Sequence, residues 1–167
     1  RLSGAEHDHV GGLQRVVVNL LRRIARERFT SVLCCIEGAG DWVRDVQCYC
    51  EAVTVMDKKP GLAFGLPFRL ARFFRMQHVD IVHCHNFGPF VYGSIGGRFA
   101  RCGGIVYKAH GPDITSKKRQ VFLQRLPLAD QTVAVSELLR RQAIEQAGIR
   151  SDRVIAIANG IDTEAYA

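Results

Sequence analysis

The sequence predicts an α/β fold, a Rossmann-like, doubly wound parallel sheet in one domain of 167 residues. Short apolar, β-branched runs alternate with segments of helical period, which is the order of a parallel sheet. Most of the runs are apolar on both faces, as in strands that helices cover on both sides. A content of 47% apolar residues fits a globular chain with a substantial core.

Six segments have the composition of buried strands. They are residues 30–36, 51–57, 79–85, 104–110, 131–136 and 153–159. Each is six or seven residues of mostly apolar character, a usual length for a strand between layers of helices.

Four segments between these runs predict helices. Residues 13–29 carry one apolar stripe with arginines on the opposite side. Residues 68–77 and a segment from Pro89 to the end before Cys102 follow. Residues 136–148 form the last, with Ser136 as the predicted N-cap and Gly148 as the terminator.

The beginning of the sequence departs from this pattern. Residues 10–21, "VGGLQRVVVNLL", have the form of a glycine turn that leads from a first strand into a first helix. Residues 1–10, "RLSGAEHDHV", do not have the pattern of a strand. The strand that should precede Gly11 is thus missing. Because the first strand is normally central in such sheets, we expect either that the chain is truncated or that another segment fills this place.

Composition excludes several classes of protein. No apolar run approaches the roughly 20 residues of a membrane span, and no signal peptide is evident. The six cysteines have no CxxC spacing, which favours reduced core thiols and a cytoplasmic protein over a metal or disulfide framework. A net charge of +7 and a pI near 9.4 favour anionic partners.

Polar residues follow the predicted strands at their carboxyl ends, where parallel sheets bind ligands. Gly11 and Gly12 lie where the first strand would have ended. The other candidates are His85 and Asn86, then His110, Gly111 and Asp113, then Ser136 and Glu137, and finally Asn159, Gly160 and Asp162. Because strand ends that are distant in sequence meet along one edge, these residues together predict a site.

Each of these residues also has a plain structural interpretation. The glycine pair is either a tight turn or a loop whose N–H groups approach an anion or a sugar. His83 and His85 share a face of their strand, and His83 suits a core or edge histidine better than a site. The segment "NGID" also suits a turn. His110 is harder to explain as a turn residue, because Gly111 beside it gives backbone freedom at a site edge.

Five stretches together resemble family four of the retaining glycosyltransferases. They are "VGGLQRVVVNLLRRI", "VDIVHCHN", "KAHGPD", "VAVSELLRRQAIEQAGI" and "VIAIANGIDTEAY". They occur in that family's order and spacing over nearly the whole chain, and the last is close to "IPNGID…F". The resemblance is to the family's N-terminal domain only.

The resemblance implies a half of a GT-B enzyme, in which two Rossmann-like domains face each other across a cleft. The N-terminal domain would hold the acceptor and close over a nucleotide-sugar donor. Gly11, Gly12 and Gly111 would lie near the donor phosphates. His110 would hydrogen-bond the transferred sugar.

The remaining candidate residues receive roles from the same resemblance. His85, Asn86 and Asp113 would line the acceptor cleft. Ser136, Glu137, Asn159, Gly160 and Asp162 would shape the cleft and hinge. Transfer would proceed with retention to a polysaccharide or lipid-linked glycan, and no metal or other cofactor is expected.

The sequence departs from the family pattern in ways that limit the prediction. Gln14 stands where the family often has glutamate, and Ala158 replaces the proline of "IPNG". Residues 1–167 would be a truncated N-terminal domain, and the donor-binding C-terminal domain is not in the sequence. We therefore expect this chain alone to be inactive.

A basic, aromatic segment suggests a further partner. In "FGLPFRLARFFRMQ", Arg69, Arg72 and Arg75 recur every three residues among phenylalanines. This pattern suits peripheral contact with the inner, anionic face of a membrane, or a helix packed on the sheet with a solvated arginine edge. Residues 116–120, on a predicted loop and helix start, add to the positive charge. Nucleic acid fits less well, because no reading motif is present.

Three other functions remain open. A non-catalytic module that binds a membrane or a glycan would share the fold without needing the glycine loop and His110 to converge. A dinucleotide-dependent oxidoreductase is disfavoured by the absence of GxGxxG, although Asp57 ends the second predicted strand. A sugar-nucleotide epimerase of the same shape fits the "HG" and "NGID" segments less well than a transferase does.

Overall fold

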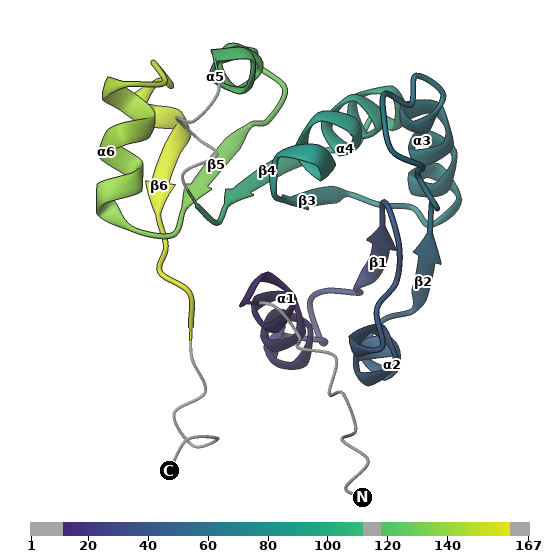
Figure 1. Cartoon of the computed structure of the whole chain (residues 1–167). Helices are drawn as coiled ribbons and strands as arrows, with labels where there is room; N and C mark the ends of the chain where they lie inside the picture. Colours follow the sequence, from purple (N-terminus) through teal and green to yellow (C-terminus); the bar gives the residue numbers. More distant parts are fainter. Residues whose placement is uncertain (1–11, 112–117, 161–167) are drawn as a thin grey trace, which may run out of the picture. The chain divides into compact units, whose positions relative to one another are not determined.

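The computed structural model describes residues 12–111 and 118–160, with the side chains of 118–120 excepted (Figure 1). The chain divides into two compact units, which we call the small unit and the large unit. The small unit is Arg1–Asp57 with Gly160–Ala167, and the large unit is Lys58–Asn159. The strands of both units are parallel, so the predicted α/β class is confirmed.

The small unit contains α1 (Gly12–Arg23), β1 (Val32–Cys35), α2 (Trp42–Val46) and β2 (Ala52–Val55). A short 3-10 turn, Gln47–Tyr49, connects α2 to β2. Strands β1 and β2 pair in parallel, with Val32 opposite Ala52. The apolar stripe of α1 buries Val17 and Leu21 against Val46, as its period predicts. Helix α1 ends six residues earlier than predicted, and the five-residue α2 is too short to have shown a period.

The large unit contains the remaining elements and most of the predicted site. Its helices are α3 (Leu66–Met76), α4 (Phe87–Ala100), α5 (Lys118–Arg125) and α6 (Glu137–Glu145), with a 3-10 turn at Ser151–Arg153. Its strands are β3 (Ile81–His85), β4 (Gly104–Ala109), β5 (Gln131–Ala134) and β6 (Val154–Ala156), and they pair in the order β3-β4-β5-β6. All four lie within the predicted strand ranges.

The six described strands form two sheets rather than the single sheet predicted from the sequence. Within the described residues, β3 pairs only with β4, so one of its edges carries no sheet partner. The first strand expected to be missing would precede Gly12, and residues 1–11 are outside the described part of the chain. That expectation stays a prediction.

One face of the four-stranded sheet is covered by helices. Because parallel crossovers are right-handed, strands added in consecutive order place their helices on the same face. Helix α4 packs its Phe90 ring on Tyr107 of β4, with centroids 4.3 Å apart. A side chain at Gly93 or Gly97 of α4 would collide with this face, since an added Cβ would lie 2.8 Å from the Cys84 sulfur or 3.2 Å from Val82.

Helices α3 and α4 lie side by side and in close contact (Figure 1). Helix α3 buries Leu70, Ala71 and Phe74 on its inner side. Gly96 of α4 faces this surface, and a Cβ there would lie 2.8 Å from the Leu70 Cβ. Because glycine has no side chain, α3 and α4 can pack closely at this point. Neither helix carries a residue of the predicted site.

Replacing Gly96 with alanine is expected to lower the free energy of unfolding by about 1–3 kcal/mol, the usual cost of overpacking. The added methyl group would also lie 3.1 Å from the carbonyl oxygen of Pro67, which cannot move without shifting α3. Gly88→Ala, in the same helix with nothing within 4 Å of its Cβ, is the matched control and should cause no loss. Urea unfolding of both variants measures the difference, and equal stability would contradict the close packing.

Candidate functional site

Two of the predicted site residues are in direct contact at the carboxyl ends of β3 and β4. The Nδ1 atom of His85 lies 3.0 Å from the Nε2 atom of His110, which is a hydrogen-bonding distance. Their rings are stacked, with centroids 5.2 Å apart and planes inclined by 25°. The convergence of these strand ends, predicted from the sequence, is confirmed for this pair.

The strand register explains why the two imidazoles meet. His85 is paired with Lys108 across the β3–β4 ladder, and His83 with Val106. Side chains of paired residues on parallel strands point to the same face, and this face repeats every second residue. His83, His85, Lys108 and His110 therefore share the face opposite α4, and we call these four residues the imidazole–lysine cluster.

Asn86 holds the turn that follows β3. Its backbone is at φ 68° and ψ 167°, a region that is almost restricted to glycine and costs about 1–3 kcal/mol for other residues. The Asn86 N–H donates to the carbonyl of Lys108 at 3.3 Å, and its own carbonyl accepts from the N–H of Phe90 at 3.1 Å. These two hydrogen bonds hold Asn86 in its strained conformation next to His85. Strained backbone conformations are often found at functional sites.

Burial and the charges of neighbouring groups lower the pKa values of the histidines in the cluster. Burial, followed by the charges of His83, His110 and Lys108, lowers the pKa of His85 to about 3. The pKa of His110 is lowered by burial and then by Lys108. Both imidazoles are therefore neutral at pH 7, and each can donate or accept a hydrogen bond.

His83 is the third ring of this stack, with its centroid 4.3 Å from that of His85. It lies on the edge strand of the sheet and remains exposed, which fits the edge histidine expected from the sequence. Partial burial of its ring, followed by the charges of Lys108 and His110, lowers its pKa to about 4. Its contact with His85 nevertheless makes it part of the cluster.

Lys108 was not identified from the sequence. Its side chain is only 8% exposed, and burial lowers its pKa. The signal that would have found it is the period of two in "KAH", which places Lys108 and His110 on the same face of the strand. Burial of that face could not be read from the sequence, because the run is apolar on both sides.

Ser136 and Glu137 have local structural partners. The Ser136 hydroxyl accepts a hydrogen bond from the N–H of Leu139 at 3.2 Å and caps α6, as predicted. The Glu137 carboxylate pairs with Arg140 at 3.0 Å and with Arg141 at 3.7 Å, one turn along the same helix. Their cleft role stays a prediction.

The glycines and the end of the last strand show no conformational constraint. Neither Gly12 nor Gly111 has a left-handed backbone, and an added Cβ at either would meet nothing within 4 Å. The backbone freedom that we expected at Gly111 is therefore not used. Asn159 and Gly160 are exposed after β6. Gly11, Asp113 and Asp162 lie outside the described residues.

The cysteines are all free thiols. Cys35 and Cys84 are buried, and burial raises the pKa of Cys35. Cys48 is exposed, so the description of core thiols fits only part of the set. Within residues 12–111 and 118–160, no three histidine, cysteine or acidic side chains are arranged as ligands of a metal.

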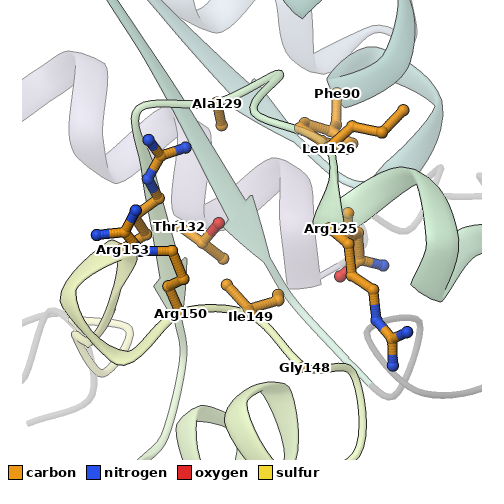
Figure 2. Close-up of a pocket in the computed structure, with 10 residues that line it drawn as sticks. Phe90, Arg125, Leu126, Ala129, Thr132, Gly148, Ile149, Arg150 and Arg153 are labelled. Carbon is orange, nitrogen blue, oxygen red and sulfur yellow. The ribbon is translucent and has the colours of Figure 1, made fainter.

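A pocket lies at the other end of the sheet, between the amino ends of β5 and β6 (Figure 2). Thr132, Ile149 and three arginines are among the residues that line it. Arg125 donates to the carbonyl of Ala147 at 2.6 Å, and Arg150 pairs with Asp152, so two of these arginines are held by the local structure. None of the four residues of the imidazole–lysine cluster lines this pocket, so the pocket is separate from the cluster.

Comparison with known proteins decides the family. The sequence model of Glycosyltransferase Family 4 matches residues 10–165, nearly the whole chain. The chain belongs to glycosyltransferase family 4. The family predicted from the motifs is thus confirmed, and no curated protein matches the chain significantly.

Two solved structures are similar to this family 4 chain. A glycosyltransferase from Rickettsia africae ESF-5 has a TM-score of 0.78 and 17% identity over 95% of this chain and 42% of its own. Anabaena Alr3699/HepE, solved in complex with UDP and glucose, has a TM-score of 0.74 and 20% identity over 95% of this chain and 43% of its own. The likeness shows the fold of a GT-B half. The chain spans about two fifths of the length of these proteins.

The lowered pKa of His85 predicts that acid destabilises the large unit. An unfolded histidine has a pKa near 6.5, so below that pH the unfolded chain binds a proton that the native chain does not. Lowering the pH from 7 to 5 should therefore cost about 2 kcal/mol of stability from this residue. His85→Gln should reduce the pH dependence of urea unfolding by about this amount, while His83 and His110, whose pKa values are also lowered, keep the remainder. An unchanged dependence would show that His85 is protonated normally in the fold.

Proposed function

We propose that the chain is the acceptor-side, N-terminal domain of a retaining glycosyltransferase. The enzyme would transfer a sugar from a nucleotide-sugar donor to a polysaccharide or lipid-linked glycan, in the cytoplasm. The observation that carries the proposal is the contact of His85 and His110 at the carboxyl ends of β3 and β4, in a chain that belongs to family 4. That Anabaena Alr3699/HepE was solved with UDP and glucose supports a nucleotide-sugar as the donor class.

His110 has the chemistry that recognition of a sugar requires. A neutral imidazole can donate one hydrogen bond and accept another, so it can hold a hydroxyl group in a fixed orientation. The contact with His85 fixes the orientation of the His110 ring. Apart from Gly111 and its two chain neighbours, no described atom lies within 4 Å of the position that a Cβ at the adjacent Gly111 would occupy.

Transfer would place the acceptor hydroxyl on the same face of the donor sugar as the leaving diphosphate. The departing diphosphate would take the acceptor proton, and hydrogen bonds and cationic side chains would stabilise its charge without a metal. Gly11, Gly12 and Gly111 would lie near the phosphates, and Asn86 and Asp113 near the acceptor. A second domain that binds the nucleotide is required, so the 167-residue chain by itself would be inactive.

The test of this function is turnover of UDP- and GDP-sugars by the full-length enzyme. His110→Ala should lower the rate of nucleotide release from the preferred donor by about a hundredfold, the cost of losing one well-placed hydrogen bond. His78→Asn is the matched control, because His78 is exposed at a turn with φ 50° and asparagine tolerates that backbone.

Two outcomes would contradict the proposal. If no donor is consumed by a folded enzyme, the chain is a binding module without catalysis, which is the alternative function. If a donor is consumed equally by His110→Ala, the transferase assignment stands and the role of His110 is wrong.

We further infer that the enzyme contacts an anionic membrane through α3 and the loop before it. Leu62, Phe64 and Phe68 are 65%, 82% and 64% exposed, and Phe68 stacks on Phe99 of α4 with ring centroids 5.2 Å apart. Arg69 and Arg72 are exposed on the same helix. Exposed apolar side chains among arginines suit the headgroup region of such a membrane.

None of the helices in the described residues combines the length and hydropathy of a membrane span. The inner side of α3 is packed on α4, so the alternative of a packed helix with a solvated arginine edge describes part of it correctly. That alternative does not account for the exposed phenylalanines.

The double variant Phe64→Ser/Phe68→Ser should bind vesicles of phosphatidylglycerol and phosphatidylcholine about tenfold more weakly, since each phenylalanine would otherwise bury apolar surface in the membrane. Phe122→Ser on α5 is the control, because Phe122 is equally exposed at 61% but belongs to another surface. Sedimentation with vesicles measures binding. Equal binding by all three proteins, or no preference for anionic vesicles, would rule out this surface.

A further inference from the structure

Lys108 is a largely buried lysine that forms no ion pair with the acidic residues in the described part of the chain. Its side chain is 92% buried on β4, between His85 of β3 and Val133 of β5 in the strand register. Within the described residues, no hydrogen bond or ion pair to the Lys108 ammonium group is found. The Lys108 Nζ is not among the buried polar atoms that lack a partner, so the ammonium group reaches solvent, where an anion can approach it.

The groups around Lys108 do not offset its positive charge. The three histidines that share its face are each affected by its charge, which lowers their pKa values. No carboxylate is among the causes of any of these shifts, so no acidic group of the described chain offsets the cluster. An anion bound here would be attracted by the Lys108 ammonium and would favour protonation of the neighbouring imidazoles.

The neighbouring helix adds to the same potential. Helix α4 begins at Phe87, two residues after His85, and its first turn contains no acidic residue. The Asn86 side chain makes no capping hydrogen bond, so the first amides of α4 are not satisfied by it. A helix N-terminus favours negative charge, and this one lies at the edge of the sheet where the cluster ends.

The hydrogen bond between the two imidazoles determines which ring nitrogens remain available to bind a ligand. Of the four ring nitrogens, Nδ1 of His85 and Nε2 of His110 are used between the rings. In the neutral pair, one of the two outer nitrogens carries a proton and the other does not, whichever ring donates. Uptake of one proton from solvent would make both outer nitrogens donors and would place a positive charge on the pair.

From these observations we propose that Lys108, His85 and His110 form a binding site for a phosphate group of a substrate. The Lys108 ammonium would donate to the phosphate oxygens, and the imidazole pair would donate from its outer nitrogens after taking up one proton. The phosphate is either the donor's diphosphate or a phosphate of the acceptor. This inference rests on the proposed function for the identity of the substrate, and Lys108 is a residue that neither the motifs nor the comparisons assign.

The test is calorimetric binding of inorganic pyrophosphate and methyl phosphate to the 167-residue chain at pH 7. Lys108→Met removes the charge but keeps the length of the side chain, and it should weaken binding by about tenfold to a hundredfold, the worth of a charge-assisted hydrogen bond. Lys108→Arg should retain most of the affinity. Lys59→Met, which removes one exposed lysine of the same unit, is the matched control and should change binding less than twofold.

A second measurement examines the proton and does not depend on any variant folding. Sulfate keeps a constant charge between pH 6 and pH 8, unlike phosphate, so it reports only the titration of the protein. Sulfate should bind at least about tenfold more tightly at pH 6 than at pH 8, because binding takes up one proton. In NMR titrations of the parent chain, sulfate should raise the pKa of the His85 and His110 rings.

The results separate the sources of phosphate and the two proposals. Tighter binding of pyrophosphate would identify the donor's diphosphate, and tighter binding of methyl phosphate a phosphorylated acceptor. No binding of any of the three anions, equal binding by Lys108→Met and its parent, or unmoved histidine resonances would overturn the site. Turnover of nucleotide-sugars by the full-length enzyme would still stand in that case, because it depends on His110 and not on a phosphate at Lys108.

Discussion

The parallel pairing of β3 with β4 is the constraint on which the rest of the site depends. Its register pairs His85 with Lys108, and His110 follows two residues after Lys108. A shift of one residue would move His83 and His85 to the helix-covered face, where α4 leaves no room at Gly93 and Gly97. The packing of α4 on one face therefore fixes the imidazole–lysine cluster on the other.

The site combines a strained backbone with partly buried polar side chains, and both features cost stability. Asn86 keeps a backbone conformation that costs free energy, and the hydrogen bond from its N–H to Lys108 connects the turn after β3 to the next strand. Below about pH 6.5 the cluster also opposes stability, because burial and neighbouring charges keep its imidazoles neutral while the same residues of the unfolded chain take up protons. Such costs in stability are typical of functional sites. The close packing of α3 on α4 contributes stability in another part of the unit.

The comparisons and the geometry support different parts of the interpretation. The family match places the chain in glycosyltransferase family 4, and the structural neighbours identify the fold. The geometry adds which residues are brought together: His85 with His110, but Ser136 and Glu137 with partners on their own helix. A polar residue at a strand end is thus a candidate for a functional site. Its hydrogen-bond partners show whether it belongs to such a site or caps a helix.

Local pattern was enough to predict much of this protein. The six strands, the long helices, the cap at Ser136 and the family all follow from residue periods and short motifs, because these depend on neighbours in the sequence. Strand ends also follow, and with them His85 and His110. The tertiary structure decided the rest. The division into two sheets, the burial of Lys108 and the strain at Asn86 depend on strand register and on contacts between distant segments, which leave no periodic signal in the chain.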